Sequence, residues 1–308
     1  MRTLVTGGAG FIGSHLVEEL LHRGESVRVL DNFSSGRREN LDALPGKLEI
    51  LEGDLRDAGT IKAAVRNVDV VFHLAAFISV PKSMEDPETC FAINVGGTVN
   101  LLEAARQAGI HMVVVSSSSA VYGNTSVFPT TEETPLQPLS PYAVSKQVDE
   151  LYAGLYTRIL GLPVTALRYF NVYGPRQRPD SDYAAAIPIF VRSLVAGASI
   201  TIFGDGKQSR DFIFVKDVAR ANLLAAEKEA GGETINICTG HETSMLDLLE
   251  ELSELSPTSP KVRFELPRPG DVYRSAGCPE KATRILGFKP ETSITEGLKQ
   301  TIEWMKSK

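Results

Sequence analysis

Cysteine is scarce in this chain, and several kinds of sequence run are missing altogether. The 308 residues include three cysteines, Cys90, Cys238 and Cys278, which form no Cys-x-x-Cys pair and have no zinc-type spacing to histidine. A disulfide scaffold and a zinc site are therefore excluded, and a reducing compartment is indicated. No stretch approaches the ~20 apolar residues of a membrane helix, and the chain starts directly on a predicted strand, without a signal peptide. We expect a cytoplasmic protein with no membrane segment and no metal.

Positive charge is not concentrated anywhere along the chain. Lys and Arg number 32 against 38 Asp and Glu, which gives a formal net charge of −6. A nucleic-acid surface would need a basic patch or run, so no nucleic acid partner is expected. An anionic small molecule remains compatible with this composition, because a few arginines can bind phosphate inside an acidic protein.

What is present is a regular alternation of apolar strands and amphipathic helices in the first half of the chain. Strands are predicted over residues 4–5, 27–30, 48–51, 68–74, 112–115 and 164–167, and helices over 11–23, 89–108 and 142–160. Strands that are apolar throughout, with helices between them, form parallel sheets covered on both faces. The sequence therefore predicts an α/β fold with a doubly wound parallel sheet of the Rossmann type.

This alternation loosens after about residue 170, where prolines and glycines cluster and the predicted helices shorten. The change predicts a Rossmann domain over residues 1–170 and a smaller α/β lobe over 171–308. Segments near 211–238 are expected to return to the first domain, because apolar runs at 212–215 and 235–237 are suited to its sheet.

A glycine pattern follows the first predicted strand and opens the first predicted helix. Gly7, Gly10 and Gly13 have the spacing that lets a backbone turn sharply and approach a dinucleotide pyrophosphate at a helix N-terminus. Asp31 ends the second strand, 18 residues after Gly13, where an acid accepts hydrogen bonds from a ribose diol and repels a 2′-phosphate. The pattern predicts NAD rather than NADP, although the arginines at 37–38 keep NADP open. A glycine-rich turn without a ligand is the alternative.

Tyr142 and Lys146 lie one helical turn apart on a predicted helix. An ammonium group close to a phenol stabilises the phenolate, and a phenolate can act as a base. By itself the spacing also fits an exposed pair with no function. Four serines at 116–119, however, end the fifth strand at the sheet edge where ligands bind, so a hydroxyl can meet a substrate oxygen beside Tyr142.

Two other polar residues follow predicted strands. Asp54 lies after the third strand, where a carboxylate can meet an adenine amino group, but a helix N-cap is an equally good interpretation. His73 closes the fourth strand, and we interpret it as a structural histidine rather than a catalytic one.

Sequence segments spread over nearly the whole length together resemble a known family. They are the stretches at 6–16 (TGGAGFIGSHL), 31–32, 53–57, 73–76, 116–123 (SSSSAVYG), 140–146 (SPYAVSK), 168–179, 204–217 and 268–271. The chain resembles the extended short-chain dehydrogenase/reductases, and within them the UDP-glucose and UDP-N-acetylglucosamine 4-epimerases. The resemblance implies an isomerase that uses tightly bound NAD and acts on a UDP-sugar.

The resemblance also implies a role for each member of the catalytic group. Tyr142 would remove the proton of the sugar O4, with Lys146 as its electrostatic partner and ribose ligand, and Ser118 would supply the catalytic hydroxyl. A hydride would pass from C4 to NAD and return to the other face of a 4-keto sugar. Dehydratases and decarboxylases of the family carry an acid after the catalytic hydroxyl, whereas this chain has Ser119 and Ala120. Epimerisation is thus the reaction that the resemblance favours.

Cofactor and substrate residues follow from the same resemblance. NAD would be bound by Gly7, Gly10, Phe11, Ile12, Gly13, Asp31, Asn32, Asp54, Leu55, Leu74, Ala75, Ala76, Asn94, Ser116, Tyr142, Lys146 and Tyr169. The UDP-sugar would be bound by Ser79, Val80, Ser118, Asn171, Ala185, Phe203, Arg210, Arg268, Asp271 and Ser275. Ser275 occupies the position beside the sugar 2-substituent, and its small size leaves space for an N-acetyl group. Activity on both glucose-type and N-acetylglucosamine-type sugars is therefore expected.

The resemblance leaves two alternative functions open and implies one partner. The apolar run at 212–215 also occurs in UDP-glucuronate 4-epimerases, for which Arg176 or Arg178 would be the carboxylate partner. A non-catalytic NAD-binding protein is the other alternative, but such proteins typically lose part of the serine, tyrosine and lysine set. The resemblance further implies a homodimer through the helices at 89–108 and 142–160.

Overall fold

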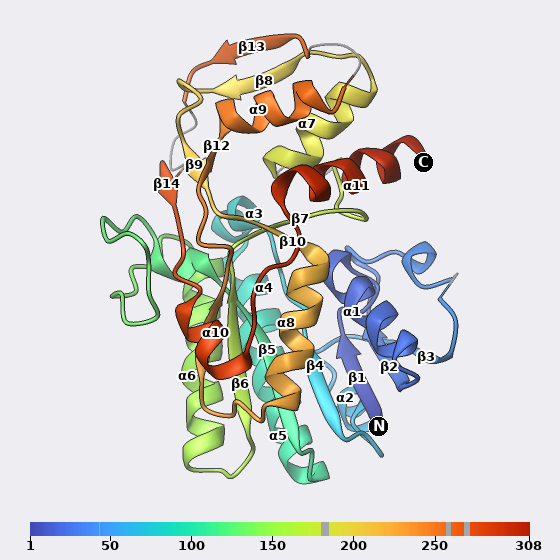
Figure 1. Cartoon of the computed structure of the whole chain (residues 1–308). Coiled ribbons are helices and arrows are strands. Elements are labelled where there is room, and N and C mark those ends of the chain that lie inside the picture. The colour runs from blue at the N-terminus through green and yellow to red at the C-terminus, as the bar shows by residue number, and fades with distance from the viewer. Residues whose placement is uncertain (43, 180–184, 257–259, 268–271) are drawn as a thin grey trace.

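The computed structural model describes residues 1–42, 44–179, 185–256, 260–267 and 272–308. Its centre is a seven-stranded sheet in the order β11-β6-β5-β4-β1-β2-β3, with every neighbouring pair parallel (Figure 1). The strands are β1 (Arg2–Thr6), β2 (Ser26–Asp31), β3 (Lys47–Glu52), β4 (Val70–His73), β5 (Met112–Ser118), β6 (Val164–Tyr169) and β11 (Thr234–Ile237). The predicted doubly wound parallel sheet is confirmed, and the strand order reverses direction between β1 and β4, where ligands bind in such sheets.

Helices cover both faces of this sheet, each face with its own apolar core. On one face α1 packs against α8, and the core includes Leu16, Val29 and Ala221. On the other face lie α2, α5 and α6, with Ile61, Leu101 and Tyr156 in the core. The helices are α1 (Phe11–His22), α2 (Ala58–Ala64), α5 (Gly97–Ala108), α6 (Pro141–Arg158), α8 (Val215–Glu227) and α10 (Glu280–Leu286).

The helix predicted over 89–108 is interrupted. It consists of α4 (Pro87–Phe91), one π-helical segment (Ala92–Gly96) and α5, and it follows the short α3 (Val80–Glu85). The predicted end at residue 108 is correct, since Gly109 follows it in the left-handed conformation with φ of 68°. Segments of π-helix often mark functional sites, and this one carries Asn94.

The second lobe has separate small sheets and a core of its own, formed by residues such as Phe190, Ile202, Leu248 and Leu298. Its helices and strands are α7 (Ala186–Val195), α9 (Met245–Glu254), α11 (Ile294–Lys306), β7 (Asn171–Tyr173), β8 (Ile200–Phe203), β9 (Ser209–Arg210), β10 (Phe212–Phe214), β12 (Thr243–Ser244), β13 (Val262–Glu265) and β14 (Arg274–Ser275). Figure 1 shows these elements above the carboxyl ends of the main strands. Two short 3-10 helices, Arg38–Asn40 and Ser119–Tyr122, complete the inventory of the described chain.

The chain returns to the main sheet after entering the second lobe, in part as predicted. Residues 234–237 form β11 beside β6, which confirms the prediction for 235–237. The prediction that 212–215 joins the same sheet is wrong, because β11 already occupies the position beside β6 and β10 pairs with β7 instead. The division into 1–170 and 171–308 stays a prediction. In the described ranges, no helix combines the length and apolarity needed to cross a membrane.

Candidate active site

The glycine cradle between β1 and α1 has the shape that the sequence predicts. Gly7 has φ of 69°, and a Cβ atom there would lie 2.7 Å from the Ala75 backbone nitrogen. A Cβ atom on Gly13 would lie 2.1 Å from the Gly7 carbonyl oxygen. Gly10 caps α1 in an extended conformation without a side-chain cap, and the first turn of α1 has no acidic residue. The helix therefore offers uncapped amides to an anion, which fits a dinucleotide pyrophosphate.

Asp31 ties this cradle to the end of β2. Its carboxylate accepts hydrogen bonds from the backbone N–H of Ala9 at 2.9 Å and of Phe33 at 2.8 Å. Burial raises the pKa of Asp31, while these two hydrogen bonds oppose the shift. A carboxylate has room for more than two donors, so a ribose diol can still be bound there. The two neighbouring arginines that kept NADP open are ion-paired, Arg37 with Glu39 and Arg38 with Glu52.

Asn32 and Asp54 meet at the same end of the sheet. Asn32 donates its amide hydrogen to Asp54 at 2.9 Å, and Arg56 donates through its backbone and its guanidinium group at 2.8 to 2.9 Å. The Arg56 guanidinium holds the pKa of Asp54 below its usual range. The N-cap alternative for Asp54 is wrong, because Asp57 caps α2 through the Gly59 N–H. A contact between Asp54 and adenine stays a prediction.

The remaining predicted cofactor contacts around the cradle differ in exposure. Leu55 is 5% exposed and packs in the core under α5, so its side chain faces the protein interior. Leu74 and Ala75 follow β4 and donate their backbone N–H groups to Thr6, and Ala76 comes directly after them, half-buried. Because the Gly7 position faces Ala75 closely, this segment forms one wall of the cradle.

Asn94 is buried and hydrogen-bonded within the protein, and its contact with the cofactor stays a prediction. It is 1% exposed, and its amide donates to the Phe77 carbonyl at 3.2 Å and to the Ser145 hydroxyl at 2.8 Å. Its oxygen accepts the Phe77 N–H at 2.6 Å. These bonds use both amide hydrogens, so Asn94 joins the segment after β4 to α6 and positions it rather than presenting a free side chain.

His73 is structural, as interpreted from the sequence. Both ring nitrogens are hydrogen-bonded, Nδ1 to the Thr6 hydroxyl at 2.7 Å and Nε2 to the Thr98 hydroxyl at 2.9 Å. Burial lowers the pKa of His73 to about 3, and the nearby Lys146 acts in the same direction. A neutral histidine therefore braces β4 against β1 and α5.

An N-cap serine and a proline define the start of α6 and so fix the positions of Tyr142 and Lys146. Ser140 caps the helix by accepting the Ala143 N–H at 3.1 Å, and Pro141 occupies the first helical position. Tyr142 is half-buried in the first turn. One turn later Lys146 is 2% exposed, and its ammonium donates to the Ser116 carbonyl at 2.9 Å and to Asp149 at 3.3 Å. The helix thus holds an ammonium against the end of β5.

A buried ion pair holds α6 against the two strands beneath it. Glu150 accepts the Ser117 hydroxyl proton at 2.5 Å and binds Arg168 of β6 at 2.7 and 2.8 Å. Arg168 also donates to the Tyr122 hydroxyl at 2.7 Å, which fixes the short helix that follows Ser118. Sequence reasoning missed this pair, although Glu150 continues the four-residue spacing of the tyrosine and lysine along α6.

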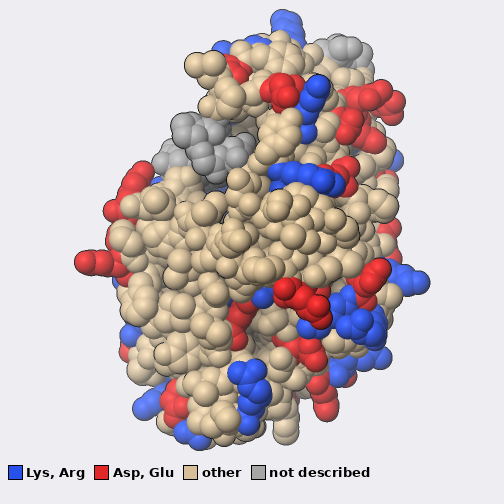
Figure 2. Space-filling view, turned by 90° about the vertical axis from the view of Figure 1, so that its left-hand side faces the viewer, with Lys and Arg blue, Asp and Glu red and all other residues tan. Residues whose placement is uncertain are grey.

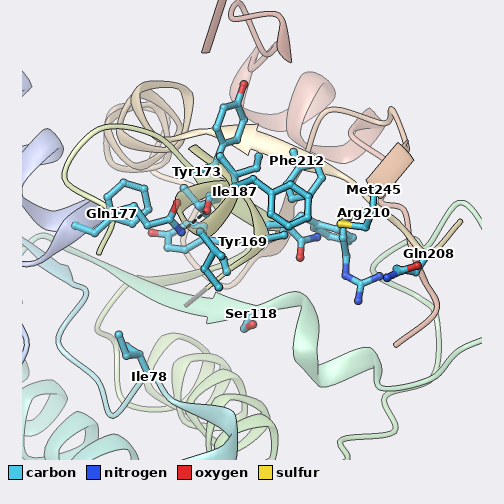
Figure 3. A pocket seen from close by; sticks show the side chains of 18 of the residues that line it. Ile78, Ser118, Tyr169, Tyr173, Gln177, Ile187, Gln208, Arg210, Phe212 and Met245 are labelled. Carbon is cyan, nitrogen blue, oxygen red and sulfur yellow. Dashed lines mark hydrogen bonds between the residues drawn. The ribbon is translucent and has the colours of Figure 1, made fainter. Parts of the chain in front are cut away.

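A cavity of about 700 Å³ lies between the carboxyl end of the main sheet and the second lobe. Ser118 and Tyr142 both line it, which brings the predicted hydroxyl and base together. Figure 3 shows Ser118 at the end of its strand, with Gln208 and Arg210 on one side and Gln177 on the other. The predicted residues that line the cavity are Phe11, Ile12, Ser118, Tyr142, Tyr169, Asn171, Ala185, Phe203 and Arg210.

Tyr169 and Asn171 belong to the floor of this cavity. Tyr169 donates its hydroxyl to Asn222 at 2.8 Å, and burial raises its pKa above the usual range. Asn171 donates its backbone and side-chain N–H groups to the Asp211 carbonyl at 3.1 and 3.2 Å. Asp211 is fully buried and accepts hydrogen bonds from the backbone of three loop residues, at positions 239, 240 and 277. These bonds fix the strand ends that carry the substrate side of the cavity.

Arg210 is the basic residue among the described cavity-lining positions. It donates to its neighbour's carbonyl, Ser209, at 2.9 Å, and its strand pairs with β14 so that Arg210 and Ser275 are register partners. Arg268 and Asp271 lie outside the described residues, so their roles stay predictions. Ser275 is half-buried beside the cavity-lining strand rather than among the lining residues.

The prediction that Ser79 and Val80 line the sugar pocket is not supported. Ser79 caps α3 by accepting the Lys82 N–H at 3.3 Å, and Val80 opens that helix 40% exposed. Within the described cavity lining, Ile78 represents this segment instead. Other lining residues that sequence reasoning missed are Gln177, Ile189, Gln208, Phe212 and Met245. Gln177, Gln208 and Phe212 lie in the segments at 168–179 and 204–217 that carry the family resemblance, and this signal could have found them. Ile189 and Met245 have no such signal, because the cavity forms from segments far apart in the chain.

Comparisons with known proteins agree with this geometry. The model of the NAD dependent epimerase/dehydratase family matches residues 3–238. The chain belongs to that family. It is 42% identical to a UDP-glucose 4-epimerase of Mycolicibacterium smegmatis, over 100% of this chain and 99% of the relative. The predicted family and the Rossmann fold are thereby confirmed, and NAD is the cofactor named in the family's description.

Two solved structures share the fold along the whole chain. One is a UDP-glucose 4-epimerase of Thermotoga maritima with UDP-glucose, at a TM-score of 0.95 and 40% identity, covering 100% of this chain and 99% of the other. The other is a UDP-N-acetylglucosamine 4-epimerase of Methanobrevibacter ruminantium, at a TM-score of 0.96 and 40% identity, covering 99% and 98%. The first is described as a UDP-glucose 4-epimerase and the second as a UDP-N-acetylglucosamine 4-epimerase, in complex with UDP-N-acetylmuramic acid.

Proposed function

We propose that this protein is an NAD-dependent 4-epimerase that interconverts UDP-glucose with UDP-galactose and UDP-N-acetylglucosamine with UDP-N-acetylgalactosamine through a transient 4-keto sugar. The observation that carries the proposal is the meeting of Ser118 and Tyr142 in one cavity, with the Lys146 ammonium buried behind them. Similarity to 4-epimerases over the whole chain supports the reaction class.

The residues of the cavity divide the chemistry between them. Tyr142 takes the proton of the sugar O4 and later returns it, acting as general base and then as general acid. Lys146 favours the phenolate form of Tyr142 and binds the cofactor ribose. Ser118 donates a hydrogen bond to O4 and orients it. The cradle residues would hold NAD, which would supply a reversible hydride acceptor for the sugar C4.

Arg210 and Asn171 bind the UDP diphosphate in this proposal. A guanidinium fork suits phosphate geometry, and Arg210 lies on the side of the cavity away from Gln177 (Figure 3). Phe203 and Ala185 line the same region, where they pack near the uracil. Because the reacting end is at Ser118, the substrate extends from there toward Arg210.

The hexose preference follows from the size of the space at the 2-position. Ser275 is small and pairs with the strand that carries Arg210, so no bulky side chain at that position excludes an N-acetyl group. A roomy pocket discriminates only weakly against a substrate that lacks those atoms. We therefore expect activity on both pairs of sugars.

UDP-glucuronate is the alternative substrate. Its sugar carboxylate would need a cationic side chain nearby, and neither of the two predicted arginines supplies one in the described cavity lining. Arg176 forms an ion pair with Glu18 of α1 at 2.7 Å, and neither Arg176 nor Arg178 is among the described residues that line the cavity. Rates with UDP-glucuronate are therefore expected to be lower than those with the neutral sugars.

The test is to incubate the purified protein, without added cofactor, with UDP-glucose, UDP-N-acetylglucosamine or UDP-glucuronate, and to follow the sugar signals by proton NMR. The 4-epimer of each neutral sugar should appear without net formation of NADH. If none of the three sugars changed even after NAD was added, the proposal would be rejected. If UDP-glucuronate alone reacted, the alternative would replace it.

We also propose a homodimer through the helices at 89–108 and 142–160, which are α4, α5 and α6. Five large apolar side chains are exposed there at 41 to 73%, namely Phe91 on α4, Val144, Leu151 and Leu155 on α6, and Ile159 at the C-cap of α6. Figure 2 shows an area with few charged side chains across the middle of the face that lies to the left in Figure 1. Large apolar side chains that are exposed together mark protein interfaces. The predicted cytoplasmic location stays a prediction.

Light scattering after size exclusion should give twice the chain mass for the wild type, and L151E should shift the protein toward the monomer. Leu266 is even more exposed, at 86%, but lies in the second lobe, so L266E is the matched control and should leave the mass unchanged. A monomeric wild type would contradict the dimer.

A further inference from the structure

Asp149 is a buried acid that the proposed mechanism does not yet use. Its carboxylate lies 3.3 Å from the Lys146 ammonium, and the two side chains are 1% and 3% exposed. The second carboxylate oxygen, Oδ1, is buried and has no hydrogen-bond partner among the described residues. Burying a carboxylate is costly unless it is paired. Here the ammonium that the mechanism needs compensates the charge, together with the nearby Thr98 hydroxyl.

We propose that Asp149 is a positioning residue that fixes the Lys146 ammonium at the end of β5 and balances its charge, and thereby sets the pH at which Tyr142 becomes a phenolate. This inference rests on the proposed roles of Tyr142 and Lys146. It concerns only residues of this chain. The Ser116 carbonyl and Asp149 together hold two of the three N–H groups of the ammonium, which leaves the third for the cofactor ribose.

The surroundings of this pair contain few other charges. On α6 itself the neighbouring acid is Glu150, whose charge adds a small part to the upward shift that burial gives the pKa of Asp149. From β4, His73 faces the ammonium but is held neutral, and from α4 the thiol of Cys90 lies near the carboxylate with its pKa raised by burial. Burial raises the pKa of Asp149 to about 6, against the opposing effect of Lys146. Asp149 is thus the direct counterion of the ammonium.

The sign of the effect on Tyr142 follows from Coulomb's law. A positive ammonium stabilises a nearby phenolate, and a negative carboxylate beside the ammonium cancels part of that field. Replacing Asp149 by asparagine keeps the shape and a hydrogen-bond acceptor but removes the negative charge. The phenolate of Tyr142 should then form at lower pH, by on the order of one unit.

The experiment titrates Tyr142 directly in the NAD-loaded protein. The ultraviolet absorbance of the phenolate is recorded against pH for the wild type and for D149N, each minus its Y142F derivative. The D149N curve should lie about one unit below the wild type, while D149E, which keeps the charge, should stay nearer to the wild type. D217N removes an equally buried acid on α8 and should leave the curve unchanged.

Coincident curves for the wild type and D149N would overturn the inference. If D149N were not recovered folded, D149S, which is smaller and still polar, gives the same comparison. Epimerisation is measured in parallel, so that the two proposals fail separately: absence of turnover in the wild type rejects the proposed function, whereas an unshifted phenolate curve rejects only the role of Asp149.

Discussion

Replacing Tyr142 by phenylalanine is expected to lower kcat by about 10²- to 10⁴-fold, the contribution typical of a positioned general base. The variant loses one hydroxyl and no packing volume. The hydrogen bond that Tyr142 makes through its backbone, from its N–H to the Ser83 hydroxyl at 3.2 Å, does not depend on that hydroxyl. The fold and the bound NAD should therefore remain. Initial rates by NMR and the NAD released on denaturation measure both quantities.

Y152F is the control for this change. Tyr152 lies on the same helix, packs against the core on the sheet and is not among the described residues that line the cavity. Its loss of a hydroxyl should leave turnover within about twofold of the wild type, as for most substitutions away from a site. If Y142F kept more than about a tenth of the wild-type rate, a role as general base at its usual magnitude would be contradicted.

The main sheet could be predicted from the sequence because its signals are local. Each strand is a short apolar run, and such a run is sufficient to predict a strand that is buried on both faces of a parallel sheet. The glycine cradle and the tyrosine-lysine spacing are local as well, since their function depends on residues within one turn of each other. Asp31 was found in the same way, from its place at the end of a strand.

The features that could not be predicted depend on hydrogen bonds and strand pairing between residues that are far apart in the sequence. The π-helical segment at 92–96 carries Asn94, whose amide binds Phe77 and Ser145, and no helical periodicity predicts such a bond. The placement of 212–214 beside β7 rather than in the main sheet depended on which strand occupied the edge. Tertiary contacts override local propensity in both cases.

Parts of the candidate site were hidden for the same reason. Ser79 and Val80 were predicted to contact the substrate, but in the described lining Ile78 faces the cavity instead. The Ser79 hydroxyl accepts a hydrogen bond within α3 and caps that helix. Asp149 and Glu150 looked like ordinary helix charges. Only the fold shows that one is buried on the Lys146 ammonium and the other on Arg168.

Replacing Gly13 by alanine should abolish NAD binding. The added Cβ atom would lie 2.1 Å from the Gly7 carbonyl oxygen and 2.9 Å from the Gly8 Cα, and both are backbone atoms that move only if the cradle moves. Overpacking of this kind also costs on the order of 1–3 kcal/mol of stability. In an unobstructed helix interior a glycine-to-alanine change would raise the free energy of unfolding by up to about 1 kcal/mol. A lower stability of G13A would therefore indicate the close contact with the Gly7 carbonyl.

G59A is the matched control. Gly59 lies in the first turn of α2, where the nearest atom to an added Cβ is a side-chain oxygen of Asp57 at 3.2 Å rather than a backbone atom. We expect G59A to keep its NAD and to have a thermal midpoint equal to or slightly above that of the wild type, and G13A to be isolated with little or no NAD and a lower midpoint. Full NAD content in G13A would mean that the cofactor does not approach the backbone between β1 and α1, and the cradle would lose its assigned function.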